Sequence, residues 1–276
     1  MIARLPRLHA VTDDRVVGDA RFVERAVAMA VVAGPALAVQ LRTRALGGAD
    51  LLALARRLRA VLGEHGSWLV VNDRADVARA ADAAALALGR TGLALRDARR
   101  VAPGLPVSRA VHDAAEARAA EAEGADFLLA GPVYATASHP GAAAAGPALV
   151  ESAASGGRQV IAIGGITPGN ATTARRAGAW GVAAIRALWD AADPAETARA
   201  FLAVLPVSAS LAVTVNGESR PVAEGTTLRG LLEELDLDPR AVVVEHNRRI
   251  VRRDGLAATA LAAGDVIELV HFVGGG

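Results

Sequence analysis

The last three residues, Gly274, Gly275 and Gly276, have the type and position that most directly allow chemistry. Glycine has no side chain, so a free glycine tail can extend into the narrow active site of another enzyme. There its terminal carboxylate can be activated and converted into a carrier group. A glycine-rich end can also be only a frayed terminus. The residues that precede the tail must distinguish these two interpretations.

A second set of polar residues follows short apolar segments earlier in the chain. Paired arginines can bind anionic oxygens through two parallel hydrogen bonds. Adjacent glycines can place backbone N–H groups against a phosphate, and carboxylate or amide oxygens can hold Mg²⁺ or orient a polar ring. The candidates are Gln40, Arg42, Arg44, Asn72, Asp73, Arg109, His112, Thr136, Ser138, His139, Gly164, Gly165 and Arg186.

Three of these candidates also have simpler interpretations. Asp73 could cap the following helix at its N-terminus, because Asp is a preferred capping residue. Gln40 could be a buried core residue, and Arg186 could be an exposed helix arginine. The sequence alone leaves these alternatives open.

The elements that position this second set are short apolar segments alternating with Ala/Arg-rich amphipathic segments. Eight such repeats within residues 1–205 predict a (β/α)8 TIM barrel, whose active site lies at the C-terminal ends of its strands. A doubly wound open sheet is the alternative, disfavoured because no early Gly-x-Gly-x-x-Gly motif is present. The predicted strands are residues 8–12, 36–40, 68–72, 84–88, 106–109, 125–130, 160–163 and 181–185.

Residues 210–276 have a different pattern, and residues 206–209 are predicted to be a linker. An Asn216-Gly217 turn follows an apolar strand, as in a two-residue β-hairpin. Thr227 is placed to cap a helix over 228–235, and a last strand covers 265–273. The order strand, hairpin, helix, strand predicts a small β-grasp domain of the ubiquitin-like α+β type.

Composition narrows the function classes. The chain has no cysteine and no lysine, which excludes thiol nucleophiles, thiolate metal sites and Schiff-base lysines. Residues 1–209 hold 23 Arg against 19 acidic residues and residues 210–276 hold 7 against 10, so protein partners and anionic small molecules fit better than nucleic acid. No signal peptide or membrane-spanning stretch is recognised, which predicts a cytoplasmic protein without a membrane partner.

The segment Gly-Asp-Val-Ile-Glu-Leu-Val-His-Phe-Val-Gly-Gly-Gly over residues 264–276 resembles ThiS, the sulfur carrier of thiamine thiazole synthesis. The resemblance implies that an E1-like, ThiF-type partner adenylates Gly276 with ATP. The tail is then converted to a thiocarboxylate and delivers sulfur to a ThiG-type thiazole synthase. By this resemblance Gly274 and Gly275 form the tail that enters both partners.

The order and spacing of the polar residues after the predicted strands resemble the thiamine phosphate synthase/TenI family across the whole barrel. The motifs are Gln-Leu-Arg-Thr-Arg (40–44), Asn-Asp (72–73), Val-His (111–112), Gly-Pro-Val-Tyr (131–134) and Ile-Gly-Gly-Ile (163–166). The synthase branch joins thiazole phosphate to hydroxymethylpyrimidine diphosphate and uses Mg²⁺. The TenI branch isomerises a thiazole carboxylate phosphate without metal.

The chain departs from the synthase pattern at several positions. Gly92 stands where the family has a second Mg²⁺-binding aspartate, Ala110 replaces a serine, and His139 and Arg44 replace lysines. One carboxylate is a poor Mg²⁺ site, so these losses favour a TenI-like tautomerase.

In that prediction His139 is the proton shuttle, His112 a weaker candidate, and no cofactor is needed. The alternatives are an active synthase, with Asp73 binding Mg²⁺, and a catalytically silent barrel that scaffolds the carrier. The barrel could also form a homodimer.

Overall fold

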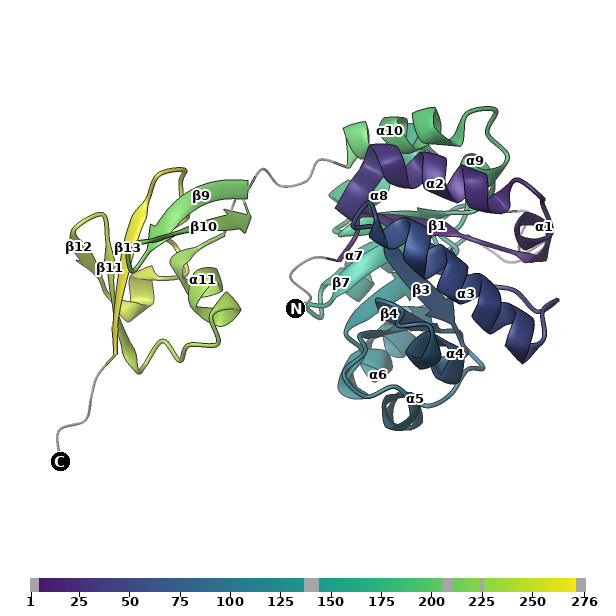
Figure 1. Cartoon of the computed structure of the whole chain (residues 1–276). Helices are drawn as coiled ribbons and strands as arrows, with labels where there is room; N and C mark the ends of the chain where they lie inside the picture. Colours follow the sequence, from purple (N-terminus) through teal and green to yellow (C-terminus); the bar gives the residue numbers. More distant parts are fainter. Residues whose placement is uncertain (1–4, 137–143, 206–209, 224–225, 272–276) are drawn as a thin grey trace. The chain divides into compact units, whose positions relative to one another are not determined.

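The structure is a computed structural model that describes residues 5–136, 144–205, 210–223 and 226–271. Contacts divide the chain into two compact units, residues 1–205 and residues 206–276 (Figure 1). Each unit has its own hydrophobic core, as expected for separate domains. None of the described helices is long and apolar enough to cross a membrane.

The first unit is a closed barrel of eight parallel strands, in which each strand pairs with its sequence neighbours and β1 pairs with β8. The predicted TIM barrel is therefore confirmed. The strands are apolar because the barrel interior covers one face and helices cover the other. They are β1 (Leu8–Val11), β2 (Leu37–Leu41), β3 (Trp68–Asn72), β4 (Ala85–Leu88), β5 (Val107–Val111), β6 (Phe127–Ala130), β7 (Gln159–Ile163) and β8 (Gly181–Ala184).

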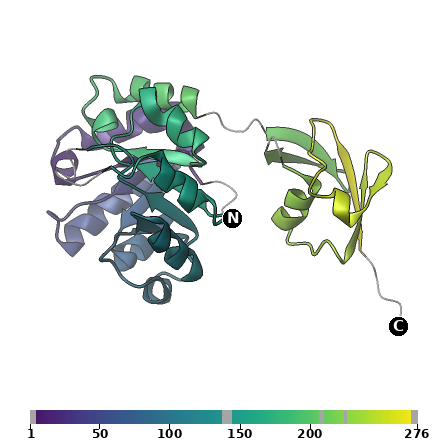
Figure 2. The ribbon, with the colours of Figure 1, turned by 180° about the vertical axis from the view of Figure 1, so that it is seen from behind.

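Helices surround the strands on the outside of the barrel (Figure 2). Their small, buried alanine faces allow close packing on the strands. Asp13, Asp113 and Asp193 accept hydrogen bonds at helix N-termini from the backbone of Val16, Glu116 and Ala195, respectively. The helices are α1 (Asp14–Val17), α2 (Phe22–Ala33), α3 (Gly48–Gly63), α4 (Ala75–Ala80), α5 (Leu95–Val101), α6 (Ala114–Ala122), α7 (Pro147–Ala154), α8 (Pro168–Arg176), α9 (Arg186–Trp189) and α10 (Pro194–Val204), with a 3-10 turn at Gly34–Ala36.

The barrel interior is filled unevenly. Phe127 and His9 lie inside it, with ring centroids 6.2 Å apart. His9 is fully buried, and burial lowers the pKa of its imidazole to about 4, so it is neutral near pH 7. Other interior positions carry alanine, among them Ala87 and Ala183, which also line a cavity. These small side chains leave space below the strand ends.

The second unit is a five-stranded sheet in the order β10-β9-β13-β11-β12, with one helix. β9 and β10 form an antiparallel hairpin around Asn216 and Gly217, which both have positive φ. Thr227 caps the helix, because its side-chain oxygen accepts a hydrogen bond from Gly230 N at 3.2 Å. This confirms the β-grasp prediction. The elements are β9 (Ser210–Val215), β10 (Glu218–Ala223), α11 (Leu228–Glu234), β11 (Val242–His246), β12 (Arg249–Val251), a 3-10 turn (Arg253–Gly255) and β13 (Val266–His271).

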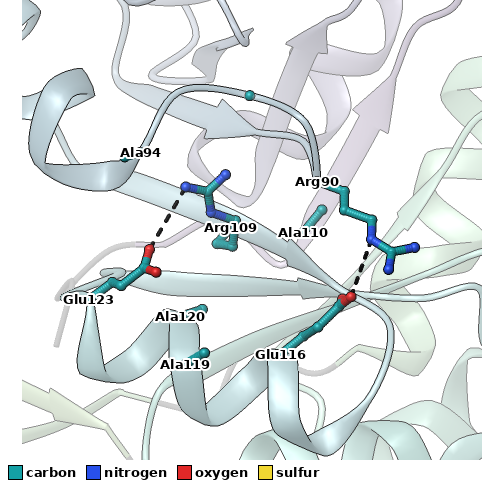
Figure 3. Close-up of a pocket in the computed structure, with 9 residues that line it drawn as sticks. Arg90, Ala94, Arg109, Ala110, Glu116, Ala119, Ala120 and Glu123 are labelled. Atoms are coloured by element: carbon teal, nitrogen blue, oxygen red, sulfur yellow. Dashed lines mark ion pairs between the residues drawn. The ribbon is translucent and has the colours of Figure 1, made fainter.

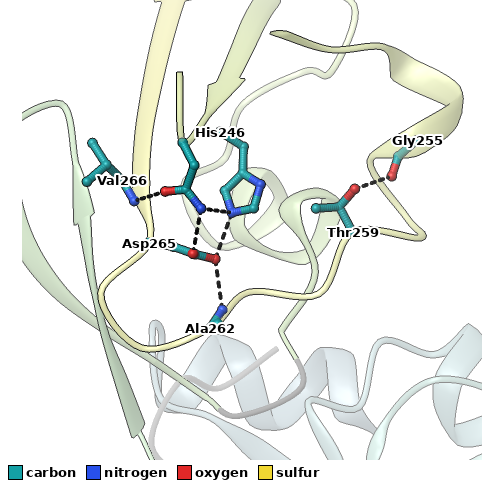
Figure 4. Close-up of polar contacts among 7 residues, drawn as sticks. His246, Gly255, Thr259, Ala262, Asp265 and Val266 are labelled. Carbon is teal, nitrogen blue, oxygen red and sulfur yellow. Dashed lines mark hydrogen bonds and ion pairs between the residues drawn. The ribbon is translucent and has the colours of Figure 1, made fainter. Parts of the chain in front are cut away.

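A polar cluster holds the start of β13 (Figure 4). The Asp265 carboxylate lies 2.7 Å from His246 Nε2 and accepts hydrogen bonds from Asn247 Nδ2 at 2.7 Å and Ala262 N at 2.8 Å. Burial acts to raise the pKa of Asp265, but these bonds outweigh it and the pKa is lowered. The cluster ties the β11–β12 hairpin to the strand that leads towards Gly274, Gly275 and Gly276, which lie outside the described residues.

Candidate active site

A cavity of about 1010 Å³ opens at the C-terminal ends of the barrel strands. Most of the candidate residues from the sequence line it: Gln40, Arg42, Arg44, Asn72, Asp73, His112, Thr136, Gly164, Gly165 and Arg186. Arg109 is not among the lining residues. Ser138, His139 and the tail from Gly274 to Gly276 lie outside the described residues.

Two amides and a carboxylate form a hydrogen-bonded chain on one wall. Gln40, 2% exposed, donates from Nε2 to Asn72 Oδ1 at 2.7 Å. Asn72 donates from Nδ2 to Asp73 Oδ2 at 2.7 Å. Asp73 Oδ1 accepts from the backbone N–H of Gly89 at 2.7 Å. The chain fixes the orientation of both amides, which suits them to orient a polar ring.

Asp73 does not cap the next helix. The N-cap of α4 is Arg74, and no side chain makes a cap bond there. Asp73 instead has a positive φ of 59°, and its carboxylate bonds the loop after β4. The capping alternative is therefore wrong at this position.

The residues around Asp73 do not fit a Mg²⁺ ion. Both carboxylate oxygens already accept hydrogen bonds, and position 92 contributes no side chain. A Cβ built on Gly92 would lie 2.5 Å from Asp73 Oδ1, so the carboxylate occupies the space of a side chain at position 92. Among the described residues no group of three His, Cys, Asp or Glu side chains could hold a metal. A hard divalent cation needs more oxygen ligands than one engaged carboxylate.

The Gly164-Gly165 turn after β7 suits a phosphate. Both residues have positive φ, 100° and 63°, and a Cβ on either would come within 2.6 Å of the segment after β6. Asn170 in α8 donates from Nδ2 to Gly165 O at 2.9 Å and holds the turn. Within the described residues, the backbone N–H of Gly165 makes no hydrogen bond. Such a turn before a helix can bind an anion through backbone N–H groups.

The arginine loop after β2 is held by Asp14. Its Oδ1 accepts hydrogen bonds from Thr43 Oγ1 at 2.5 Å, Arg44 N at 2.6 Å and Ala45 N at 3.1 Å. The Thr43 hydroxyl and these backbone N–H groups hold the pKa of Asp14 below its usual range. The guanidinium groups of Arg42 and Arg44 make no hydrogen bond or ion pair with another described residue. They are therefore available to bind an anion.

His112 lies at the cavity with a fixed orientation. Its Nδ1 is 2.8 Å from Glu116 Oε2, which also accepts from the His112 backbone N–H at 2.8 Å. A carboxylate accepts, so the proton of a neutral imidazole lies on Nδ1 and leaves Nε2 as a base. Glu116 was not among the candidates from the sequence. Its position four residues after His112, in the first turn of α6, is a spacing at which two side chains can meet and could have indicated the pair.

Arg109 is placed differently from its predicted role as a substrate contact. Its guanidinium donates to Gly89 O at 2.9 Å and to Leu93 O at 2.8 Å, and Glu123 lies 4.0 Å away. It lines a smaller cavity of about 350 Å³ between the loop after β4 and α6 (Figure 3). Arg109 therefore supports the loop that also carries Gly92.

The loop after β4 also carries Arg90, which lines both cavities. Arg90 was not among the candidates from the sequence. Its Nε lies 3.3 Å from Glu116 Oε1 (Figure 3). Arg186, at the first position of α9, also lines the main cavity and is exposed.

The first unit is a (β/α)8 barrel whose cavity is lined by arginines, hydrogen-bonded amides and a diglycine turn, groups that suit a phosphate, and it is joined to a domain with the β-grasp fold. The chain belongs to the family described as thiamine monophosphate synthase, which its residues 8–188 match. Residues 213–276 match the ThiS family. Both family resemblances read from the sequence are confirmed.

The relatives align with the barrel. A thiamine-phosphate synthase of Methanoculleus marisnigri is 39% identical over 199 residues, covering 70% of this chain and 92% of that protein. A thiamine-phosphate synthase of Saccharopolyspora erythraea is 42% identical over 173 residues, covering 59% of this chain and 78% of that protein. The solved thiamine phosphate pyrophosphorylase from Pyrococcus furiosus aligns with a TM-score of 0.67 and 28% identity, covering 74% of this chain and 98% of that one.

Proposed function

We propose that the chain serves thiamine biosynthesis with two activities, a barrel that makes thiamine phosphate and a β-grasp domain that carries sulfur. The observation that supports the barrel's role is the convergence of two kinds of group on one cavity. The amides of Gln40 and Asn72 lie at the ends of β2 and β3, arginines follow these strands, and the Gly164-Gly165 turn follows β7. Relatives named thiamine-phosphate synthase favour this transferase over the tautomerase that the residue losses alone favour.

In this proposal the substrates are thiazole phosphate and hydroxymethylpyrimidine diphosphate. The amides of Gln40 and Asn72 orient the pyrimidine, and the Gly164-Gly165 turn binds the thiazole phosphate. The thiazole nitrogen lone pair forms the new C–N bond to the pyrimidine methylene. The C–O bond to diphosphate breaks, diphosphate leaves with the electron pair, and the thiazole becomes a cation. Holding both reactants in one cavity supplies the proximity that the reaction needs.

The test is an assay of the purified full chain with both substrates, following thiamine phosphate and pyrophosphate in equal amounts. Asn72→Ala is expected to lower kcat/KM by at least about tenfold, because the pyrimidine loses one oriented partner. Asn170→Ala probes the thiazole side, since the Asn170 side chain donates to Gly165 O in the phosphate turn and accepts from Thr167 N at the start of α8. Absence of any thiamine phosphate from the wild-type chain would overturn the transferase proposal.

A thiazole tautomerase is the second candidate, favoured by the poor fit of Mg²⁺ at Asp73 and Gly92. That reaction moves a proton and needs no metal. Nε2 of His112, with Glu116 on the other ring nitrogen, is a suitable shuttle within the described residues. Conversion of the thiazole carboxylate phosphate tautomer by the wild type, lost in His112→Gln, would support this candidate. No turnover in either assay would leave a barrel that only scaffolds the carrier.

For the C-terminal domain we infer the role of the ThiS family. A ThiF-type partner would use ATP to adenylate Gly276, and sulfur would then displace AMP to give a thiocarboxylate for a ThiG-type synthase. The support is the match over residues 213–276, which includes Gly274, Gly275 and Gly276. The test is intact-mass measurement after incubation with ATP, a sulfur donor and the adenylating partner. The wild type should gain the mass of one O-to-S exchange, and a chain lacking Gly276 should not.

A further inference from the structure

The place where Mg²⁺ does not fit is bordered by arginines from both neighbouring strands. Asp73 follows β3, which pairs with β2 on one side and β4 on the other. Arg42 and Arg44 follow β2, and Arg90 follows β4. All three line the main cavity, and together they are called here the arginine rim.

The charge around this cavity is strongly positive. Its described lining contains five arginines, and Asp73 is its one carboxylate residue. Arg74 is already engaged, because it donates to Asp76 from Nε at 2.9 Å and from Nη2 at 2.6 Å. Arg186 follows β8, which pairs with β7 and so lies beside the strand that leads to the Gly164-Gly165 turn. The arginine rim therefore follows β2, which carries Gln40, and β4, which pairs with the strand that carries Asn72.

Arg90 can bind an anion without losing a strong ion pair. Its side chain is 71% exposed, and it meets Glu116 at 3.3 Å. An ion pair with so exposed a partner contributes little to stability, so the guanidinium can turn towards a diphosphate at low cost. Glu116 would still be held by His112 through the backbone N–H and the ring.

We propose that the arginine rim, and not a divalent metal ion, binds and neutralises the diphosphate in this barrel. The inference rests on the transferase proposed above and specifies how its leaving group is stabilised. As the C–O bond breaks, diphosphate takes the electron pair, and its growing negative charge is met by guanidinium N–H donors. Guanidinium groups bind phosphate oxygens through paired, charge-assisted hydrogen bonds and stay charged at all working pH values.

The experiment is calorimetric titration of the full chain with inorganic pyrophosphate, in EDTA and again with Mg²⁺. We expect binding in EDTA, with affinity that Mg²⁺ improves by less than about threefold, since the cations are already in place. Arg44→Gln and Arg90→Gln should each weaken binding by about tenfold, and Arg90→Lys by less. Arg57→Gln, on the exposed face of α3, removes the same charge at a site away from the rim and should leave affinity unchanged.

Two results would overturn the arginine proposal: binding that requires Mg²⁺, or an Arg90→Gln affinity equal to that of Arg57→Gln. Circular dichroism of each variant checks that it is folded. The synthase assay in EDTA is the separate readout. Metal-free pyrophosphate binding without thiamine phosphate formation would support the arginine site and count against the transferase. Thiamine phosphate formed only with Mg²⁺ would count against the arginine site and support the transferase.

Discussion

Asp73 and Gly92 share one space in the barrel: a Cβ on Gly92 would lie 2.5 Å from Asp73 Oδ1. The carboxylate uses that space to accept the 2.7 Å hydrogen bond from Gly89 N. A residue that could have been a metal ligand is therefore part of the support of the loop after β4. The site therefore differs from a two-carboxylate Mg²⁺ site in two ways: Gly92 replaces the second aspartate, and the remaining carboxylate of Asp73 is already hydrogen-bonded.

Replacing Gly92 by alanine should displace the Asp73 carboxylate and destabilise the barrel. Loss of the bond to Gly89 costs about 1 kcal/mol, which lowers the thermal midpoint of a domain this size by about 2–4 °C. Differential scanning calorimetry measures the shift. Gly169→Ala is the matched control, because its nearest neighbour atom would be 3.8 Å from the new Cβ. A Gly92→Ala midpoint equal to that of the wild type would contradict the shared-space interpretation.

Asp14 is expected to act as a positioning residue for the loop that carries Arg42 and Arg44. Asp14→Ala removes the acceptor of three hydrogen bonds that hold the backbone of the loop carrying Arg42 and Arg44. Because the two guanidinium groups are then less well positioned, KM for the diphosphate substrate should rise by about tenfold. The kcat should change less, because the reacting groups are untouched. Asp14→Asn retains an acceptor oxygen and should restore most of the affinity. A purely structural role would instead lower the fraction of active enzyme and leave KM unchanged.

The buried His9 should make barrel stability depend on pH. Its folded pKa of about 4 lies below its ordinary value of 6.5, so the unfolded chain binds the proton first as pH falls. Stability is therefore full above pH 6.5 and falls as pH drops towards 4, by about 3 kcal/mol in total. Urea unfolding at several pH values measures this slope. In His9→Leu the slope should be shallower over this range, and equal slopes in the wild type and His9→Leu would contradict this assignment.

In the β-grasp domain, Asp265→Ala should loosen the start of β13. The change removes the partner of His246, Asn247 and Ala262 N, and unpaired polar groups in a partly buried site cost about 1–3 kcal/mol. Hydrogen–deuterium exchange should become faster in residues 242–271, with barrel strands unchanged. Glu268→Ala, on the opposite, exposed side of β13, is the control. Unchanged exchange in Asp265→Ala would show that the cluster does not hold the strand.

Local patterns in the sequence were sufficient for both folds. Alternating apolar strands and amphipathic helices repeat eight times before residue 205, and this period predicts the barrel without long-range information. The Asn216-Gly217 turn and the Thr227 cap depend only on residues within a few positions, and the structure has both. The order of strands in turn placed most of the candidate site residues at one end of the barrel.

What only the tertiary structure decided is the direction of individual side chains. Arg109 is the last residue of the predicted strand 106–109, yet its guanidinium donates to Gly89 O and Leu93 O. These residues lie 16 to 20 positions away and meet Arg109 only when β4 and β5 pair. The Asp73 carboxylate likewise meets Gly89 N only because β3 and β4 pair. Arg90 carries no motif, and barrel closure alone brings it to the cavity. Sequence periodicity specifies which face of an element is buried, whereas polar partners depend on contacts between strands that only the closed barrel brings together.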